Sequence, residues 1–151
     1  MALGAAAALL LALLPTAGAA ELEIAAPSAI PIDAATGTVL YEKDAHTPLA
    51  PASVTKIMTL LLVMEALDAG RISWDDQVIA SEAAAGKGGS QVYLEAGEQM
   101  SMEDMIKSVA VVSANDCATA LAEHIAGSEQ AFVAMMNQRA QELGMENTHF
   151  V

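Results

Sequence analysis

Hydrophobic residues follow one another almost without interruption over 57–64, in the stretch "LAPASVTKIMTLLLVMEALDAG". This run predicts a helix over 53–69 that ends at Gly70, a residue common just after helices. Because the helix is apolar on nearly all sides, the pattern is typical of one buried in a core. Its first turn nevertheless carries Ser53 and Lys56, which share a helix face because they are three residues apart.

A second pattern of short β-type runs lies closer to the N-terminus. The runs 29–33 and 38–42 flank the sequence Ala-Ala-Thr-Gly, in which Gly37 can adopt the positive φ of a tight turn. Pro31 has no N–H to donate to a neighbouring strand. The sequence therefore predicts a β-hairpin with irregular pairing.

The rest of the chain is predicted to be mostly helical, with one short strand. The Gly-rich "GKGGS" at 86–90 is typical of a flexible surface loop. Serines at helix starts and glycines at helix ends mark the boundaries. The expected elements are a strand at 77–80, a helix beginning at Ser101, a second helix that follows "SAND" and ends near Gly127, and a third from Ser128 to Gly144.

The first twenty residues, "MALGAAAALLLALLPTAGAA", carry no charge. They run apolar as far as Leu14, break at Pro15 and end in small residues, which is the order found in a secretory signal peptide, although a basic start is missing. We expect residues 1–20 to be a signal peptide cleaved near Ala19 or Ala20. An uncleaved anchor or a buried helix is the alternative, but the run is shorter than the roughly 20 residues that cross a bilayer.

Charge and composition narrow the classes of function. The chain has 6 basic and 19 acidic residues and a formal net charge of −13, so it has no field that attracts phosphates, and we expect no nucleic-acid partner. A single cysteine, Cys117, excludes an internal disulfide. The three histidines lack the spacing of a zinc site, and we expect neither a metal nor a cofactor.

The pairing of Ser53 with Lys56 is typical of a serine nucleophile activated by a lysine base. Burial and the positive end of a helix dipole both lower the pKa of a lysine, and a neutral amine can take the proton of a nearby hydroxyl. This makes a serine nucleophilic without a histidine, and the N–H groups at the helix start can stabilise the resulting oxyanion. Alternatively, Ser53 caps the helix and Lys56 extends to solvent.

A second polar pair, Ser113 and Asn115, lies between two predicted helices. A hydroxyl can relay a proton, and a carboxamide can bind a peptide C=O and N–H together. Alternatively, the two residues cap the following helix. Each pattern alone is expected by chance about 0.5 times in a chain of this length. Their occurrence in this order, both at helix starts, favours a catalytic site.

The chain resembles a known family, the low-molecular-mass penicillin-binding proteins of the D-alanyl-D-alanine carboxypeptidase type, peptidase family S11. The resemblance extends over "IDAATGTVLYEKDAHTPLAPASVTKIMT", "GGSQVYLEAGEQMSMEDMIKSVAVVSANDCATALAEHIAGS" and "FVAMMNQRAQELGMENTHF". It implies a β-lactamase/transpeptidase-like fold of the α/β (α+β) class. The part present here would hold the N-terminal β-hairpin, the buried helix with Ser53 and Lys56, and a mostly helical subdomain.

The resemblance also implies a role for each motif residue. Ser53 would attack the D-Ala-D-Ala bond of a peptidoglycan stem peptide, with Lys56 as general base. Ser113 would pass the proton to the leaving D-alanine, and Asn115 would orient the substrate. β-Lactams would acylate Ser53 and leave slowly. The protein would be exported and act in the cell envelope, in cell-wall biogenesis and cell shape, with possible peripheral association of the full-length protein with the outer face of the cytoplasmic membrane.

One departure from the family is large: its third motif, Lys-Thr-Gly, does not occur in the chain. We therefore interpret 24–151 as the N-terminal part of a catalytic domain, in an incomplete sequence or a truncated gene product. Two alternatives are a β-lactamase of related fold and an inactive fragment that only binds peptide or penicillin. The chain has Ser-Ala-Asn where class A β-lactamases usually have Ser-Asp-Asn.

Overall fold

A computed structural model describes residues 23–151, so the predicted signal peptide at 1–20 lies outside the described residues. The chain divides into two compact units, Met1–Thr47 and Pro48–Val151. Within 23–151, no helix has both the length and the apolar character needed to cross a membrane.

The first unit contains the predicted hairpin. Ala29 pairs with Lys43 and Ile32 pairs with Val39, both in antiparallel fashion, and Gly37 has a φ of +72° in the turn between them. The two pairings are isolated bridges, with no continuous ladder between them. The hairpin and its irregular pairing are therefore both confirmed.

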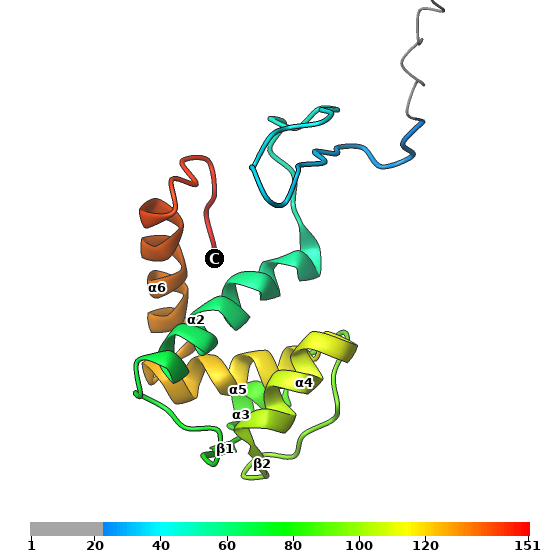
Figure 1. Cartoon of the computed structure of the whole chain (residues 1–151). Coiled ribbons are helices and arrows are strands. Elements are labelled where there is room, and N and C mark those ends of the chain that lie inside the picture. The colour runs from blue at the N-terminus through cyan, green and yellow to red at the C-terminus, as the bar shows by residue number, and fades with distance from the viewer. Residues whose placement is uncertain (1–22) are drawn as a thin grey trace, which may run out of the picture. The chain divides into compact units, whose positions relative to one another are not determined.

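The second unit combines helices with a small sheet, which agrees with the predicted mixed class (Figure 1). Its elements are the 3-10 turn η1 (Ala52–Thr55), α2 (Lys56–Asp68), β1 (Gln77–Ile79), α3 (Glu82–Ala85), β2 (Gln99–Ser101), α4 (Met102–Val112), α5 (Asn115–Ala126) and α6 (Glu129–Glu142).

Strand β1 was predicted, but its partner β2 was not. The two strands are antiparallel, with Val78 opposite Met100. Strand β2 has only three residues and, unlike β1, contains no β-branched side chain, so no local pattern predicts it. Pairing between the strands, a tertiary event, is what makes 99–101 extended.

Side-chain caps and glycines set the helix limits as the sequence predicts. Ser101 precedes α4 and its hydroxyl accepts a hydrogen bond from the N–H of Asp104 at 3.1 Å. Ser128 does the same for the N–H of Ala131 before α6, also at 3.1 Å. Gly127 ends α5 with a φ of +80°. These local signals depend on neighbouring residues alone.

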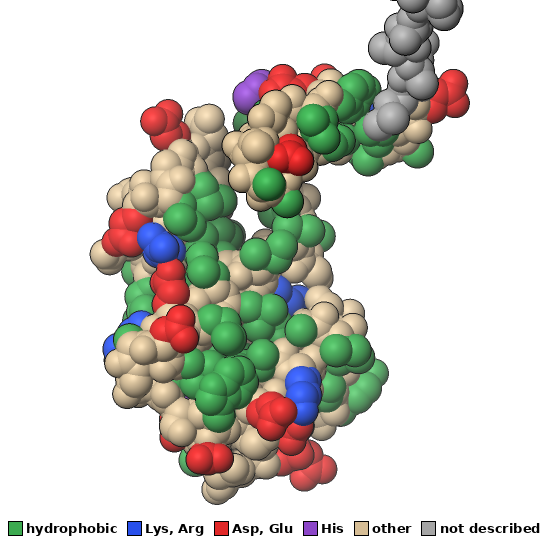
Figure 2. Space-filling model, viewed as in Figure 1, with side chains coloured by type: hydrophobic (Ala, Val, Ile, Leu, Met, Phe, Trp, Pro, Cys, Tyr) green, Lys and Arg blue, Asp and Glu red, His purple; other side chains and the backbone are tan. Residues whose placement is uncertain are grey.

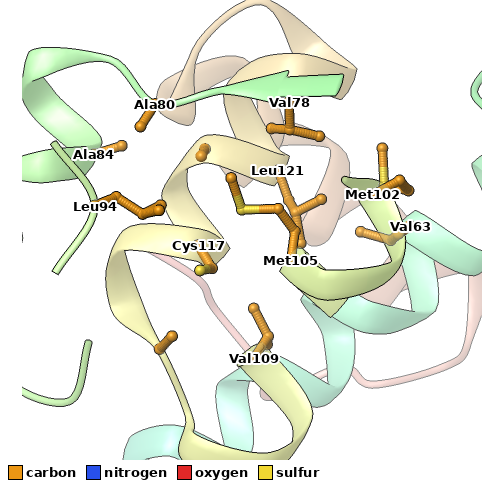
Figure 3. Close-up of a cluster of buried hydrophobic side chains, with 12 residues drawn as sticks. Val63, Val78, Ala80, Ala84, Leu94, Met102, Met105, Val109, Cys117 and Leu121 are labelled. Carbon is orange, nitrogen blue, oxygen red and sulfur yellow. The ribbon is translucent and has the colours of Figure 1, made fainter. Parts of the chain in front are cut away.

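Helix α5 lies at the centre of the second unit and packs against α2, α3, α4, α6 and β1. Figure 3 shows one core cluster, in which side chains from several elements point toward one another, among them Val63 of α2, Val78 of β1, Met105 of α4 and Leu121 of α5. A second cluster joins α2, α5 and α6 through residues that include Phe132. The core thus fixes α2 and α4 on α5.

The prediction of a fully buried helix at 53–69 is wrong for the described residues. The α-helix begins at Lys56, and it buries one side only, through Met58, Thr59, Leu62, Val63 and Ala66. Ile57 is 67% exposed. The reason is tertiary: α4, α5 and α6 cover one side of α2, and hydrophobic side chains are left at the surface of this unit (Figure 2).

Asp116, in the first turn of α5, is a fully buried carboxylate. It accepts hydrogen bonds from the backbone N–H groups of Val92 and Leu94, each at 3.1 Å, and from its neighbour Cys117 at 2.9 Å. Burial of a charged group is tolerated when such donors surround it. Asp116 therefore joins the loop after α3 to the central helix.

We expect Asp116→Asn to lower the free energy of unfolding by about 1–3 kcal/mol, because an amide NH₂ would face N–H donors and leave buried groups unsatisfied. Chemical denaturation of the two proteins measures this difference. Asp75→Asn is the matched control, since it removes the same charge from an exposed carboxylate. Equal stability of the two variants would contradict the structural role of Asp116.

Candidate active site

Ser53 and Lys56 meet where the 3-10 turn passes into α2. Ser53 lies in η1 and Lys56 is the first residue of α2. Side chains three residues apart are eclipsed in a 3-10 turn. Accordingly, Lys56 Nζ donates to Ser53 Oγ at 3.4 Å. Ser53 is exposed, so a substrate can reach its hydroxyl.

Burial lowers the pKa of Lys56 below that of an ordinary lysine. The side chain is half-buried, and no carboxylate in the described part of the chain forms an ion pair with it. Desolvation disfavours the charged ammonium, and the N-terminal position on α2 has the same effect. Lys56 is thus suited to give up its proton and act as a base.

Capping of a helix, the alternative interpretation of both motifs, does not account for Ser53, Ser113 or Asn115. The N-cap of α2 is Thr55, and the N-cap of α5 is Ala114; neither side chain makes a capping hydrogen bond. Ser53 caps neither η1 nor α2, because η1 follows Pro51. The capping explanation is therefore wrong for Ser53, Ser113 and Asn115 alike.

Ser113 occupies the junction between α4 and α5. Its backbone is left-handed, with φ 60° and ψ 38°, which is uncommon outside glycine. Its Oγ is buried and has no hydrogen-bond partner within the described residues. Buried hydroxyls normally have a partner, so an exception calls for an explanation, of which a catalytic role is one. The junction thus presents a hydroxyl that is not used in holding the described fold together.

Asn115 begins α5 and contacts the loop that follows α3. Its backbone N–H donates to the carbonyl of Ser90 at 2.7 Å, and its Nδ2 donates to the carbonyl of Gly88 at 2.7 Å. The "GKGGS" stretch lies at the surface: its glycines and Ser90 are exposed, while Lys87 is half-buried and forms an ion pair with Glu129. No local pattern predicts that two carbonyls of this stretch bind Asn115, because these contacts join residues more than 20 positions apart in the chain.

The two motifs lie on helices that pack together. Helix α2 contacts both α4 and α5, as Figure 1 shows. Leu60, one turn after Lys56, packs on the cluster that contains Val109 of α4 and Ala114 of the junction. In the region from 23 to 151, no hydrogen bond connects Ser113 or Asn115 with Ser53 or Lys56. The packing of α2 against α4 and α5 therefore sets how the two motifs are arranged.

Cys117 lies close to this junction but does not have the character of a nucleophile. It is fully buried, and burial, with the nearby Asp116 carboxylate, raises the pKa of its thiol to about 11. The reactive form of cysteine is the thiolate, so this thiol is protonated at neutral pH. Across 23–151, no group of three or more His, Cys, Asp or Glu side chains is placed to hold a metal ion.

Comparison with known proteins places these residues in a family. The peptidase family S11, described as D-alanyl-D-alanine carboxypeptidase, matches residues 15–151. The D-alanyl-D-alanine carboxypeptidase DacF of Bacillus subtilis is 54% identical over 130 residues, which are 86% of this chain and 33% of that protein. The chain thus spans about a third of the length of this curated relative.

Solved structures agree with this placement. The crystal structure of the D-alanyl-D-alanine carboxypeptidase DacD from Francisella tularensis has a TM-score of 0.84 at 45% identity, over 87% of this chain and 32% of that one. Penicillin-binding protein D2 from Listeria monocytogenes, in its ampicillin-bound form, has a TM-score of 0.76 at 31% identity, over 87% and 52%. These neighbours confirm the β-lactamase/transpeptidase-like fold, of which the chain holds a part. The chain belongs to peptidase family S11, the D-alanyl-D-alanine carboxypeptidases.

Proposed function

We propose that residues 24–151 form the N-terminal part of the catalytic domain of a serine-type D-Ala-D-Ala carboxypeptidase. The protein would remove the terminal D-alanine from peptidoglycan stem peptides. The observation that carries this proposal is the 3.4 Å contact between Lys56 Nζ and Ser53 Oγ, with a lysine whose pKa is lowered by burial. Membership of the S11 family supports the choice of substrate.

In the proposed reaction, neutral Lys56 takes the proton of Ser53 while Oγ attacks the carbonyl of the penultimate D-alanine. Ser53 lies in the first turn of η1, where backbone N–H groups lack helical partners, so its N–H would donate to the oxyanion. Ser113 relays the proton taken up by Lys56 to the departing amine, and Asn115 binds the peptide. Water then hydrolyses the ester. β-Lactams resemble the dipeptide and would acylate the same hydroxyl.

The remaining parts of the site would come from the rest of the encoded protein. The chain spans about a third of DacF and has no Lys-Thr-Gly motif. We place that motif, which would bind the substrate carboxylate, in sequence beyond residue 151. Because stem peptides lie outside the cytoplasmic membrane, the protein would be exported. It would act in the cell envelope, at the outer face of the cytoplasmic membrane, which agrees with the signal peptide predicted at 1–20.

Release of D-alanine from a pentapeptide tests this function in the protein expressed from its complete reading frame. We expect release, together with labelling by a fluorescent penicillin. Rapid hydrolysis of the β-lactam without D-alanine release would instead identify a β-lactamase. Labelling without either turnover would identify a protein that only binds.

Ser53→Ala is expected to abolish both penicillin labelling and D-alanine release, because no acyl-enzyme can form without the hydroxyl. Gel fluorescence after incubation with labelled penicillin measures the first effect. Ser73→Ala, which removes an exposed hydroxyl elsewhere in the second unit, serves as the matched control and should label normally. Equal labelling of the two variants would contradict Ser53 as the nucleophile.

Acylation is expected to accelerate with rising pH, because only the neutral amine of Lys56 accepts a proton. The midpoint of this rise should lie below the pKa of an ordinary lysine, since burial lowers it. Lys56→Arg keeps the positive charge but cannot lose its proton near neutral pH, so the rate should fall by about 10²–10⁴-fold. Stopped-flow acylation over a pH series measures both effects.

The matched control for this substitution is Lys107→Arg. Lys107 is exposed, and its pKa is raised by its ion pair with Glu103, so the variant should retain the pH profile of the parent protein. A profile without a pH-dependent rise, or full activity in Lys56→Arg, would exclude Lys56 as the base.

A further inference from the structure

The loop over 88–94 is fastened to the start of α5 at two points. At its first end, the carbonyls of Gly88 and Ser90 accept hydrogen bonds from the side chain and the backbone of Asn115. At its second end, the buried carboxylate of Asp116 accepts the N–H groups of Val92 and Leu94. Two successive residues of one helical turn therefore hold the whole loop.

The second attachment shapes the backbone between its two donors. Tyr93 lies between Val92 and Leu94 and has a φ of +64° with 78% of its surface exposed. A non-glycine residue in this region is strained and persists only where its surroundings hold it. The bonds to Asp116 supply that restraint, so the loop has a defined conformation beside Asn115.

Gly89 lies where any side chain would meet the carboxamide of Asn115. Its φ is +80°, and a Cβ built on it would lie 2.8 Å from Asn115 Nδ2. Carbon and nitrogen atoms that are not bonded do not come this close in proteins. Any side chain at 89 would therefore displace the carboxamide from the Gly88 carbonyl. Gly97 differs in this respect: its φ is +86°, but its Cβ would meet nothing within 4 Å.

We propose that Gly89 is a positioning residue for Asn115. By having no side chain, it lets the carboxamide donate to Gly88 and so fixes its orientation before substrate binds. The second hydrogen of Nδ2 is then left to donate to a peptide C=O, and the oxygen Oδ1 is left to accept from a peptide N–H. This inference rests on the proposed role of Asn115 in binding substrate. Groups that are held in place avoid the entropic cost of ordering them on binding.

Gly89→Ala tests the proposal in the protein expressed from its complete reading frame. We expect kcat/KM for D-alanine release to fall by about 10–100-fold, because the displaced amide binds substrate poorly. Gly97→Ala carries a comparable backbone strain without the contact, and it should stay within about twofold of the parent. Gly89→Asn is a second variant. Asparagine adopts a positive φ more readily than alanine but also carries a Cβ, so this variant should behave like Gly89→Ala.

A second readout does not depend on activity. In NMR spectra, the side-chain NH₂ of Asn115 should lose its protection from hydrogen exchange in Gly89→Ala but keep it in Gly97→Ala. Protection retained in Gly89→Ala, or equal losses of kcat/KM in the two alanine variants, would overturn the proposal. If the parent protein neither releases D-alanine nor binds penicillin, the proposed function fails, and the Asn115 signals alone decide whether Gly89 positions the amide.

Discussion

Packing against α5 is the constraint on which the second unit depends. Small or compact side chains on this helix, among them Cys117, Ala120 and Ala122, are buried. They allow neighbouring elements to approach closely, and α5 takes part in both core clusters. Since α2, α4 and α6 all pack on it, the position of each site residue follows from the position of α5.

The first two residues of α5 connect this packed helix to a loop at the surface. Asn115 and Asp116 follow one another, yet one bonds an exposed loop and the other is fully buried. Both attach the 88–94 loop to the helix. The irregular backbone of this loop is therefore attached to the helix at both ends, and a loop needs such support to bind a substrate in one orientation.

The arrangement of Ser53 and Lys56, in contrast, depends on residues that are close together in the chain. One turn of 3-10 helix sets the distance between the hydroxyl and the amine, and partial burial lowers the pKa of the amine. A lysine in water, or one in an ion pair as Lys107 is, would hold its proton. Ser53 and Lys56 are thus arranged locally, whereas Ser113 and Asn115 reach their places through the core.

The sequence by itself determined what depends on neighbouring residues: the hairpin turn at Gly37, the cap at Ser101, the helix stop at Gly127 and the close approach of Ser53 to Lys56. Its motifs were also specific enough to name the family. Tertiary structure alone decided which side of α2 is buried, how β2 forms, and that Asp116 and Asn115 hold the 88–94 loop. Those outcomes depend on contacts between residues far apart in the chain, and no local pattern of hydrophobic and polar positions records such contacts.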